Sequence, residues 1–205
     1  MIIDWEKTYN DIIKFENKYL NNEKEEVYKG ISRKIWGNWD GWKLIDKYKK
    51  YGYKDIEELN KALITDAYLE TLVVDFYKRN FWNMVHGDEL PSKIARKLFD
   101  TAVDLGVRLS IVLLQKSLNG INIKRRKNKK TDLFITLQED GKYGKKTAKA
   151  IQAVFAEYGK MKGQEEVLDW YCEYQAERYH AIVTRNPNQK VFLRSWLRRA
   201  SYRGD

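Results

Sequence analysis

Apolar residues recur at helical spacing through most of this chain, and only two prolines interrupt its 205 residues. Because proline breaks the interior of a helix, such a chain can form long helices. Low proline and glycine contents also disfavour turn-dense all-β folds. The helical pattern covers residues 3–20, 43–50, 55–64, 66–84, 92–118, 145–158, 164–184 and 188–200. The sequence therefore predicts a mainly α fold.

Three segments interrupt the helical pattern. Residues 21–32 begin polar and then mix β-forming residues with Gly30, which predicts a small β-hairpin near 26–32. Residues 35–42 contain three tryptophans and two glycines and predict an irregular aromatic segment. Residues 86–91 hold a glycine and a proline, so they end one helix before the next begins. We therefore place a boundary there, between a region 1–90 and a region 91–205.

The composition excludes several classes of protein. With 43% apolar and 33% charged residues, the chain is expected to fold rather than to be disordered. A single cysteine, Cys172, excludes an intramolecular disulfide framework and a multi-cysteine zinc cluster. The two histidines, His86 and His180, have no partner at ligand spacing. We expect no metal and no organic cofactor.

Hydropathy and charge constrain the location and the partners. No apolar run approaches the roughly 20 residues of a membrane-spanning helix, and the charged N-terminus lacks the apolar core of a signal peptide. The formal charge of +10 attracts polyanions such as nucleic acid, anionic lipid or bacterial cell wall. Residues 124–130 carry six cations in seven positions, which fits either phosphate binding or a solvated loop.

One carboxylate, Glu16, lies in the apolar stripe of the predicted helix 3–20. On a helical wheel, the residues within about 40° of it are Trp5, Tyr9, Ile12 and Leu20. Loss of water at such a position raises the pKa of a carboxyl group, which then stays protonated and can act as a general acid. The alternative is a structural role, in which Glu16 pairs with a buried arginine or caps a neighbouring backbone.

Glycosidases of the usual kind need a second carboxylate, and the segment after Glu16 offers several. The candidates are Glu23, Glu25, Glu26 and Asp40. Glu25 and Glu26 adjoin the predicted hairpin and are the best placed of these, although acids in a polar loop are often only solvated. Nearby aromatic rings offer flat faces on which sugar rings can stack, or they pack in the core. These rings belong to Trp36, Trp39 and Trp42.

The N-terminal motifs resemble a known family. Phe15-Glu16-Asn17-Lys18-Tyr19 is similar to the Glu-Gly-Gly-Tyr motif of glycoside hydrolase family 108, the bacterial and phage N-acetylmuramidases. Residues 26–32 resemble its Glu-Thr-Tyr-x-Gly-Ile segment, and residues 39–46 its Trp-x-Gly-Trp…Asp stretch. The chain departs from the pattern where Asn17 and Lys18 replace two glycines and Val27 replaces a threonine.

The rest of the chain resembles the peptidoglycan-binding domain (type 3) that accompanies this family. Residues 99–106 are similar to its start, and Leu114-Gln115 to its Leu-Gln signature. Residues 140–147 fit its Asp-Gly-x-x-Gly-x-x-Thr signature, and residues 178–199 its tail. The resemblance thus covers nearly the whole chain, in order.

The resemblance implies a lysozyme-like fold and a peptidoglycan hydrolase that cleaves the β-1,4 bond between N-acetylmuramic acid and N-acetylglucosamine. It implies that Glu16 protonates the leaving oxygen, and we expect Glu25 or Glu26 to orient water. We expect the substrate to be bound by Tyr19, Tyr28, Trp36, Trp39 and Trp42.

The expected partners are peptidoglycan glycan strands, with a holin or a secretion system providing the route from the cytoplasm to the cell wall. We expect no specific nucleic acid and no membrane span. Two alternatives remain: a wall-binding protein that has lost hydrolysis, and a basic helical protein that binds nucleic acid through residues 124–130.

Overall fold

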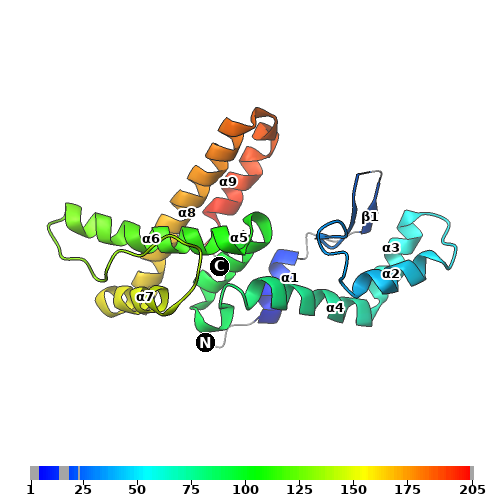
Figure 1. The fold of residues 1–205 in the computed structure, drawn as a ribbon, viewed down its shortest axis with the longest axis horizontal. Helices are drawn as coiled ribbons and strands as arrows, with labels where there is room; N and C mark the ends of the chain where they lie inside the picture. Colours follow the sequence, from blue (N-terminus) through cyan, green and yellow to red (C-terminus); the bar gives the residue numbers. More distant parts are fainter. Residues whose placement is uncertain (1–4, 14–18, 23, 204–205) are drawn as a thin grey trace. The chain divides into compact units, whose positions relative to one another are not determined.

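A computed structural model describes residues 5–13, 19–22 and 24–203. The described residues divide into two compact units, one before and one after the boundary between Asn80 and Phe81. Helices dominate both units, and the strands of the described residues form one small antiparallel sheet in the first unit (Figure 1). The predicted mainly α fold with a small hairpin is confirmed.

The described residues of the first unit combine helices with the sheet, and a π-helical turn, η1 (Lys78–Trp82), follows the last of these helices. The elements of the unit are α1 (Trp5–Ile13), β1 (Tyr19–Asn21), β2 (Glu26–Tyr28), β3 (Ile31–Ser32), α2 (Gly41–Lys49), α3 (Ile56–Thr65) and α4 (Ala67–Tyr77). The strand order is β1-β2-β3, and Tyr28 pairs with Tyr19 on one side and with Ile31 on the other. Lys29 and Gly30 form the two-residue turn between β2 and β3 with φ of 44° and 77°, the conformation that matches the twist of a tight hairpin.

The predicted helix over residues 3–20 is wrong at its C-terminal end. α1 ends at Ile13, and Tyr19–Asn21 forms a strand instead. The amide of Asn60 binds both backbone groups of Tyr19, accepting from its N–H at 2.7 Å and donating to its carbonyl at 3.1 Å, so tertiary contacts override the helical pattern. Leu20 is 54% exposed and does not belong to an apolar stripe. Glu16 lies outside the described residues.

The second unit is a helical array. Its elements are the 3₁₀ turn η2 (Gly87–Glu89), α5 (Ser92–Leu105), α6 (Val107–Lys127), α7 (Lys145–Tyr158), α8 (Lys160–Arg185), the 3₁₀ segment η3 (Pro187–Phe192) and α9 (Leu193–Ser201). α6 packs against α5 and α8, and α8 also packs against α7 and α9 (Figure 1). The core between them is filled by apolar side chains such as Leu98, Leu114 and Leu168, none of which is exposed.

Amide side chains of α6 hold the segment between α6 and α7. Asn119 accepts from the N–H of Leu137 at 2.8 Å and donates to the carbonyl of Leu137 at 2.9 Å. Gln115 accepts from the N–H of Gly141 at 2.9 Å and donates to Asp140 at 2.9 Å. The Leu-Gln and Asp-Gly signatures of the sequence are therefore two sides of one structural contact.

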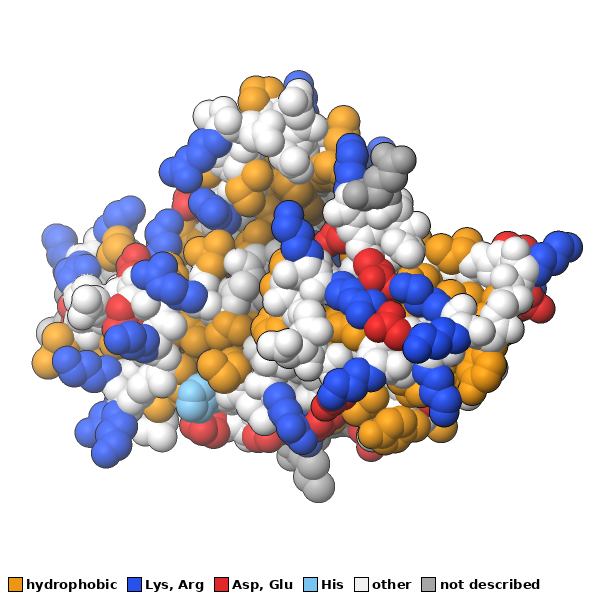
Figure 2. All heavy atoms as spheres, turned by 45° about the vertical axis from the view of Figure 1, so that its right-hand side comes forward, with side chains coloured by type: hydrophobic (Ala, Val, Ile, Leu, Met, Phe, Trp, Pro, Cys, Tyr) orange, Lys and Arg blue, Asp and Glu red, His pale blue; other side chains and the backbone are white. Residues whose placement is uncertain are grey.

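The basic segment 124–130 was expected to be a loop, but α6 continues through Lys127. Arg125 is buried and donates to Glu157 at 2.5 Å and to the carbonyl of Thr131 at 2.8 Å. Lys124 binds Glu166 on α8 at 2.9 Å. Part of the positive charge of this segment therefore joins α6 to α7 and α8. On the face of the molecule that Figure 2 shows, acidic side chains are interspersed among the basic ones.

A buried lysine fastens the last helix of the chain. Lys97 on α5 is fully buried, and its ammonium donates to the carbonyls of Arg199 at 3.0 Å and Ala200 at 2.8 Å in the last turn of α9. The guanidinium of Arg199 pairs with Asp100 at 3.3 Å and Asp104 at 2.6 Å, one and two turns along α5. Burial lowers the pKa of Lys97.

Replacement of Lys97 by methionine keeps most of its volume and removes both hydrogen bonds. The buried carbonyl of Ala200 then loses this donor, while that of Arg199 keeps the N–H of Tyr202 at 3.2 Å. We therefore expect Lys97→Met to lower the free energy of unfolding by about 1–3 kcal/mol. Urea denaturation followed by near-ultraviolet circular dichroism measures this. Lys93→Met, one turn earlier on α5 at a partly exposed ion pair with Glu165, is the control and should cost less than about 1 kcal/mol. Equal losses in the two variants would contradict this role.

Candidate active site

The sheet of the first unit brings two of the predicted site residues together. Tyr19 is buried on β1, and its hydroxyl donates to Oε1 of Glu26 on β2 at 2.6 Å. The pairing of β1 with β2, in which Asn21 lies opposite Glu26, places the two strands for this contact. Tyr19 therefore holds a carboxylate rather than presenting its ring to solvent.

Two cations complete the surroundings of Glu26. Lys49 on α2 donates to Oε1 at 3.0 Å, and Arg33, just after β3, donates to Oε2 at 3.1 Å. Arg33 also binds both oxygens of Asp46 on α2, at 2.7 and 2.6 Å. We call these five residues, including Tyr19, the Glu26 network; it ties the sheet to α2. The sequence analysis did not select Arg33 or Lys49. One signal was available for Lys49, because it lies three residues after Asp46 and residues at this spacing share a helix face.

The Glu26 network fixes the charge of its carboxylate. Burial by itself would raise the pKa of Glu26, but the hydrogen bonds from Tyr19 and Lys49 and the charges of Lys49 and Arg33 outweigh it and lower the pKa. Burial and the hydrogen bond to Glu26 raise the pKa of Tyr19. Glu26 is thus an ionised carboxylate at neutral pH and cannot serve as a proton donor.

The neighbouring loop acids differ from Glu26. Glu25 is exposed, and its backbone N–H donates to Oδ1 of Asn22 at 3.0 Å, as does that of Lys24 at 2.9 Å. This turn leaves the Glu25 carboxylate at the surface. Glu23, like Glu16, lies outside the described residues. Asp40 is exposed and pairs with Lys43 at 2.8 Å.

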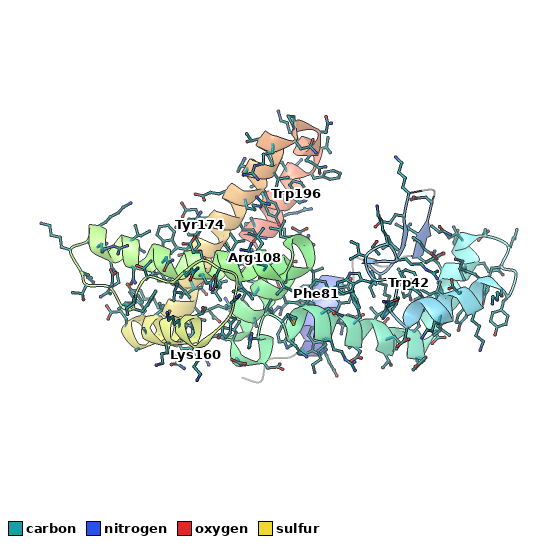
Figure 3. The ribbon with its side chains drawn as sticks, viewed as in Figure 1. Trp42, Phe81, Arg108, Lys160, Tyr174 and Trp196 are labelled. Atoms are coloured by element: carbon teal, nitrogen blue, oxygen red, sulfur yellow. The ribbon has the colours of Figure 1, made fainter. Side chains whose placement is uncertain are left out.

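Two of the predicted substrate-binding rings lie in the core. Tyr28 has no exposed surface, and its hydroxyl donates to the carbonyl of Leu63 at 3.3 Å. Trp42 is 1% exposed, its indole N–H donates to the carbonyl of Trp36 at 3.0 Å, and the Arg33 guanidinium lies 5.3 Å from its ring centre. Figure 3 labels Trp42 within the first unit. For Trp42, this burial is the packing role that we weighed against sugar stacking; for Tyr28, burial of the whole side chain leaves no ring surface for a sugar.

The other two tryptophans line an open cavity of about 380 Å³, the indole cavity. Trp36 meets Phe76 edge-on at 5.0 Å, and the Trp39 indole N–H donates to the carbonyl of Leu72 at 3.4 Å. A Cβ on Gly41 would lie 2.2 Å from the Trp39 ring, which explains the glycine between the tryptophans. The polar groups of the cavity come from Asn38, Asp40, Asp75, Arg79 and Asn80. Indole faces beside amides and carboxylates are suited to a carbohydrate.

In the part of the chain that the structure describes, no group of three or more His, Cys, Asp or Glu side chains is arranged to hold a metal ion. Nor does any helix of the described ranges combine the length and apolar character that crossing a bilayer demands.

Comparison with known proteins finds a family match for each of two successive segments of the chain. Residues 9–106 match the family model Glycosyl hydrolase 108, and residues 109–201 match the model Predicted Peptidoglycan domain. The solved structure of Brucella abortus SagA is similar, with a TM-score of 0.61 and 20% sequence identity over 98% of this chain and 91% of that chain. This last likeness concerns the fold alone. A search of curated proteins found no match.

These findings define first a class, that of a peptidoglycan hydrolase in which a glycosidase segment is joined to a peptidoglycan-binding segment. The first match concerns one segment of the chain: residues 9–106 are of the glycosyl hydrolase 108 type, and residues 109–201 are of the peptidoglycan-binding type. The matched segment contains the Glu26 network and the indole cavity. It also extends through α5, which packs in the second compact unit.

The lowered pKa of Glu26 predicts how stability depends on pH. Because its folded pKa lies below the unfolded value of about 4.3, the network contributes stability above that pH and loses it as the pH falls through the folded pKa. We expect Glu26→Gln to lower the free energy of unfolding by about 1–3 kcal/mol at pH 7. The difference from wild type should shrink below pH about 4. Urea titrations at pH 7 and pH 3, read by tryptophan circular dichroism, test this.

Asp40→Asn is the matched control, because it removes a carboxylate from an exposed pair with Lys43. It should leave unfolding unchanged at both pH values. A Glu26→Gln variant as stable as this control at pH 7 would contradict the proposed importance of the network.

Proposed function

We propose that this peptidoglycan hydrolase is a muramidase, which cleaves the β-1,4 bond between N-acetylmuramic acid and N-acetylglucosamine. The match of residues 9–106 to glycosyl hydrolase family 108 carries the proposal, because that segment holds Glu16 within the sequence motif that resembles the family. The indole cavity supports it, since an aromatic and amide-lined surface is suited to glycan binding. In this proposal Glu16 protonates the leaving oxygen as the glycosidic bond breaks.

We assign the orientation of water to Glu25 rather than to Glu26. Both oxygens of Glu26 already accept hydrogen bonds from Tyr19, Lys49 and Arg33. The carboxylate of Glu25 is exposed, and the turn at Asn22 positions the backbone that carries it. Glu26 then acts through the Glu26 network, as an anchor that orders the sheet beside the site.

The proposal also assigns separate roles to the two regions of the chain. Residues 1–90 would hold the catalytic site, and residues 91–205 would bind the cell wall, with the positive charge of the chain favouring a wall that carries carboxylates and phosphates. The enzyme would be made in the cytoplasm and act on the wall after passage through a holin-type or secretion-type route. The proposed substrate, peptidoglycan, lies outside the cell membrane, and this supports the location.

A single substitution tests the proton donor. Glu16→Gln keeps the size of the side chain and removes its acid, so we expect clearing of a peptidoglycan suspension to slow by about 10²-fold or more. Glu6→Gln replaces an exposed acid of α1 and should clear at the wild-type rate. Retained activity in Glu16→Gln would remove this residue from the mechanism, and an inactive wild type would favour a wall-binding protein without hydrolysis.

Mass spectrometry of the digest distinguishes the bonds that are cleaved. We expect products with a reducing N-acetylmuramic acid end. A reducing N-acetylglucosamine end would identify a glucosaminidase instead, and separation of peptides from the glycan would identify an amidase; either result overturns the proposal.

The indole cavity predicts a separate effect on binding. Trp36→Ala removes one aromatic face, worth about 1 kcal/mol of stacking, so we expect KM for soluble peptidoglycan fragments to rise about fivefold while kcat changes little. Tyr68→Ala removes an aromatic ring of α4 that is 65% exposed and does not line the cavity, and it serves as the control. Steady-state kinetics on the two variants measure this, and equal KM values would show that the cavity does not bind the glycan.

A further inference from the structure

The second unit contains a larger cavity that the proposed glycosidase reaction does not use. It has a volume of about 1020 Å³ and is lined by η2, the start of α5, Tyr143, α7 and the start of α8. We call it the α5–α8 cavity. Both matched segments contribute to it, with residues 88–92 from the first and residues 143–164 from the second.

The apolar lining of the α5–α8 cavity is mostly aliphatic. Leu90 and Ile151 are 3% and 4% exposed, while Met161 at its edge is 78% exposed. The ring of Tyr143 stacks on His86 with a centroid distance of 4.5 Å, so one of its faces is already covered. The ring of Phe155 also lines the cavity, but most of its apolar side chains are aliphatic and accommodate methyl and methylene groups.

A buried amide in the cavity wall lacks a partner. Gln164 is 8% exposed, and its Oε1 is buried with no hydrogen-bond partner among the residues that the structure describes. Buried polar atoms are nearly always paired, so this acceptor, on a residue of the cavity wall, can take a hydrogen bond from a donor there. Pro91 and Ser92 also line the cavity, and α5 begins there without a side-chain cap, so its first N–H groups offer donors. A peptide backbone supplies both the matching donor and the matching acceptor.

Charges of both signs lie at the cavity. Asp88 accepts from the Trp82 indole at 2.9 Å, and Glu89 hydrogen-bonds His86 at 2.8 Å. Each of these contacts uses one oxygen of the carboxylate. Lys160, labelled in Figure 3 at the start of α8, is exposed and forms no ion pair with a described residue. A ligand that carries both an ammonium and a carboxylate group finds complementary charges here.

We propose that the α5–α8 cavity binds the short peptide of peptidoglycan, with its backbone on Gln164 and the start of α5, its aliphatic groups on Leu90 and Ile151, and a carboxylate near Lys160. The choice of the cell wall as the source of this peptide rests on the proposed function. The second unit would then recognise the peptide part of the polymer, while the indole cavity of the first unit takes its glycan.

The test compares two probes on the full chain by isothermal titration calorimetry. One is the peptide released from purified peptidoglycan by an amidase, and the other is the peptide-free glycan strand. Wild type should bind the peptide, and Gln164→Leu and Lys160→Gln should each weaken that binding about tenfold. Lys162→Gln changes an exposed lysine of the same helix that does not line the cavity, and it should bind like wild type.

Lys160 is exposed, so its substitution separates a binding defect from a folding defect. Wild-type affinity in both Gln164→Leu and Lys160→Gln, absence of peptide binding by wild type, or loss of glycan binding rather than peptide binding in these variants would overturn the inference. Hydrolysis of the peptide-free strand by the same preparations tests the proposed function independently. Peptide binding without hydrolysis would leave this inference standing and remove only the proposed function.

Discussion

The order of the first unit depends on the ionised carboxylate of Glu26. A carboxylate with little exposed surface loses water, and it remains charged here because one hydroxyl, one ammonium and one guanidinium point at its two oxygens. These three donors come from β1, from α2 and from the segment after β3. All three elements are therefore joined to the carboxylate of Glu26. Removal of any one donor leaves a charge with incomplete compensation, so the network acts as a unit rather than as separate ion pairs.

The same logic explains which aromatic residues remain available for a ligand. Arg33 is held by Glu26 and Asp46 and packs its guanidinium over Trp42, which is thereby committed to the interior. Trp42 in turn donates to the carbonyl of Trp36 and fixes the start of the aromatic segment. Trp36 and Trp39 then border a cavity instead of filling the core. The compensation of the Glu26 charge by Arg33 thus influences which tryptophan is buried and which tryptophans line the cavity.

Periodicity was sufficient to predict most helices. Residues 145–158 form α7 as expected, because their apolar positions repeat at the helical period and Gly144 and Gly159 flank them. It failed at residues 19–21, where the partner of the backbone is the side chain of Asn60, far away in sequence. It also ended the helix too early, at residue 118, whereas α6 continues through Lys127. The charges of residues 124–127 suggested a loop there, although Arg125 is buried against Glu157. Long-range polar contacts leave no local signal.

The candidate site was predictable only in part. Motif resemblance pointed to Glu26, Tyr19, Trp39 and Trp42, and ring chemistry added Trp36. Residue type alone does not separate Trp42, which is buried, from Trp36, which lines a cavity. The partners of Glu26 were missed because Arg33 and Lys49 resemble ordinary surface cations in a chain with 39 of them. The α5–α8 cavity had no sequence signal, since the segments that form it are more than fifty residues apart.

The amide contacts from α6 have a consequence for how relatives of this chain can diverge. Asn119 and Gln115 bind main-chain atoms of residues 137–142, and main-chain atoms are the same whatever the side chain. The shape of that segment is therefore encoded on α6, while outward positions such as Gln138, which is exposed, carry no part of it. Mutations can accumulate at those positions without altering the path of the backbone, so a new surface chemistry can evolve on an inherited shape.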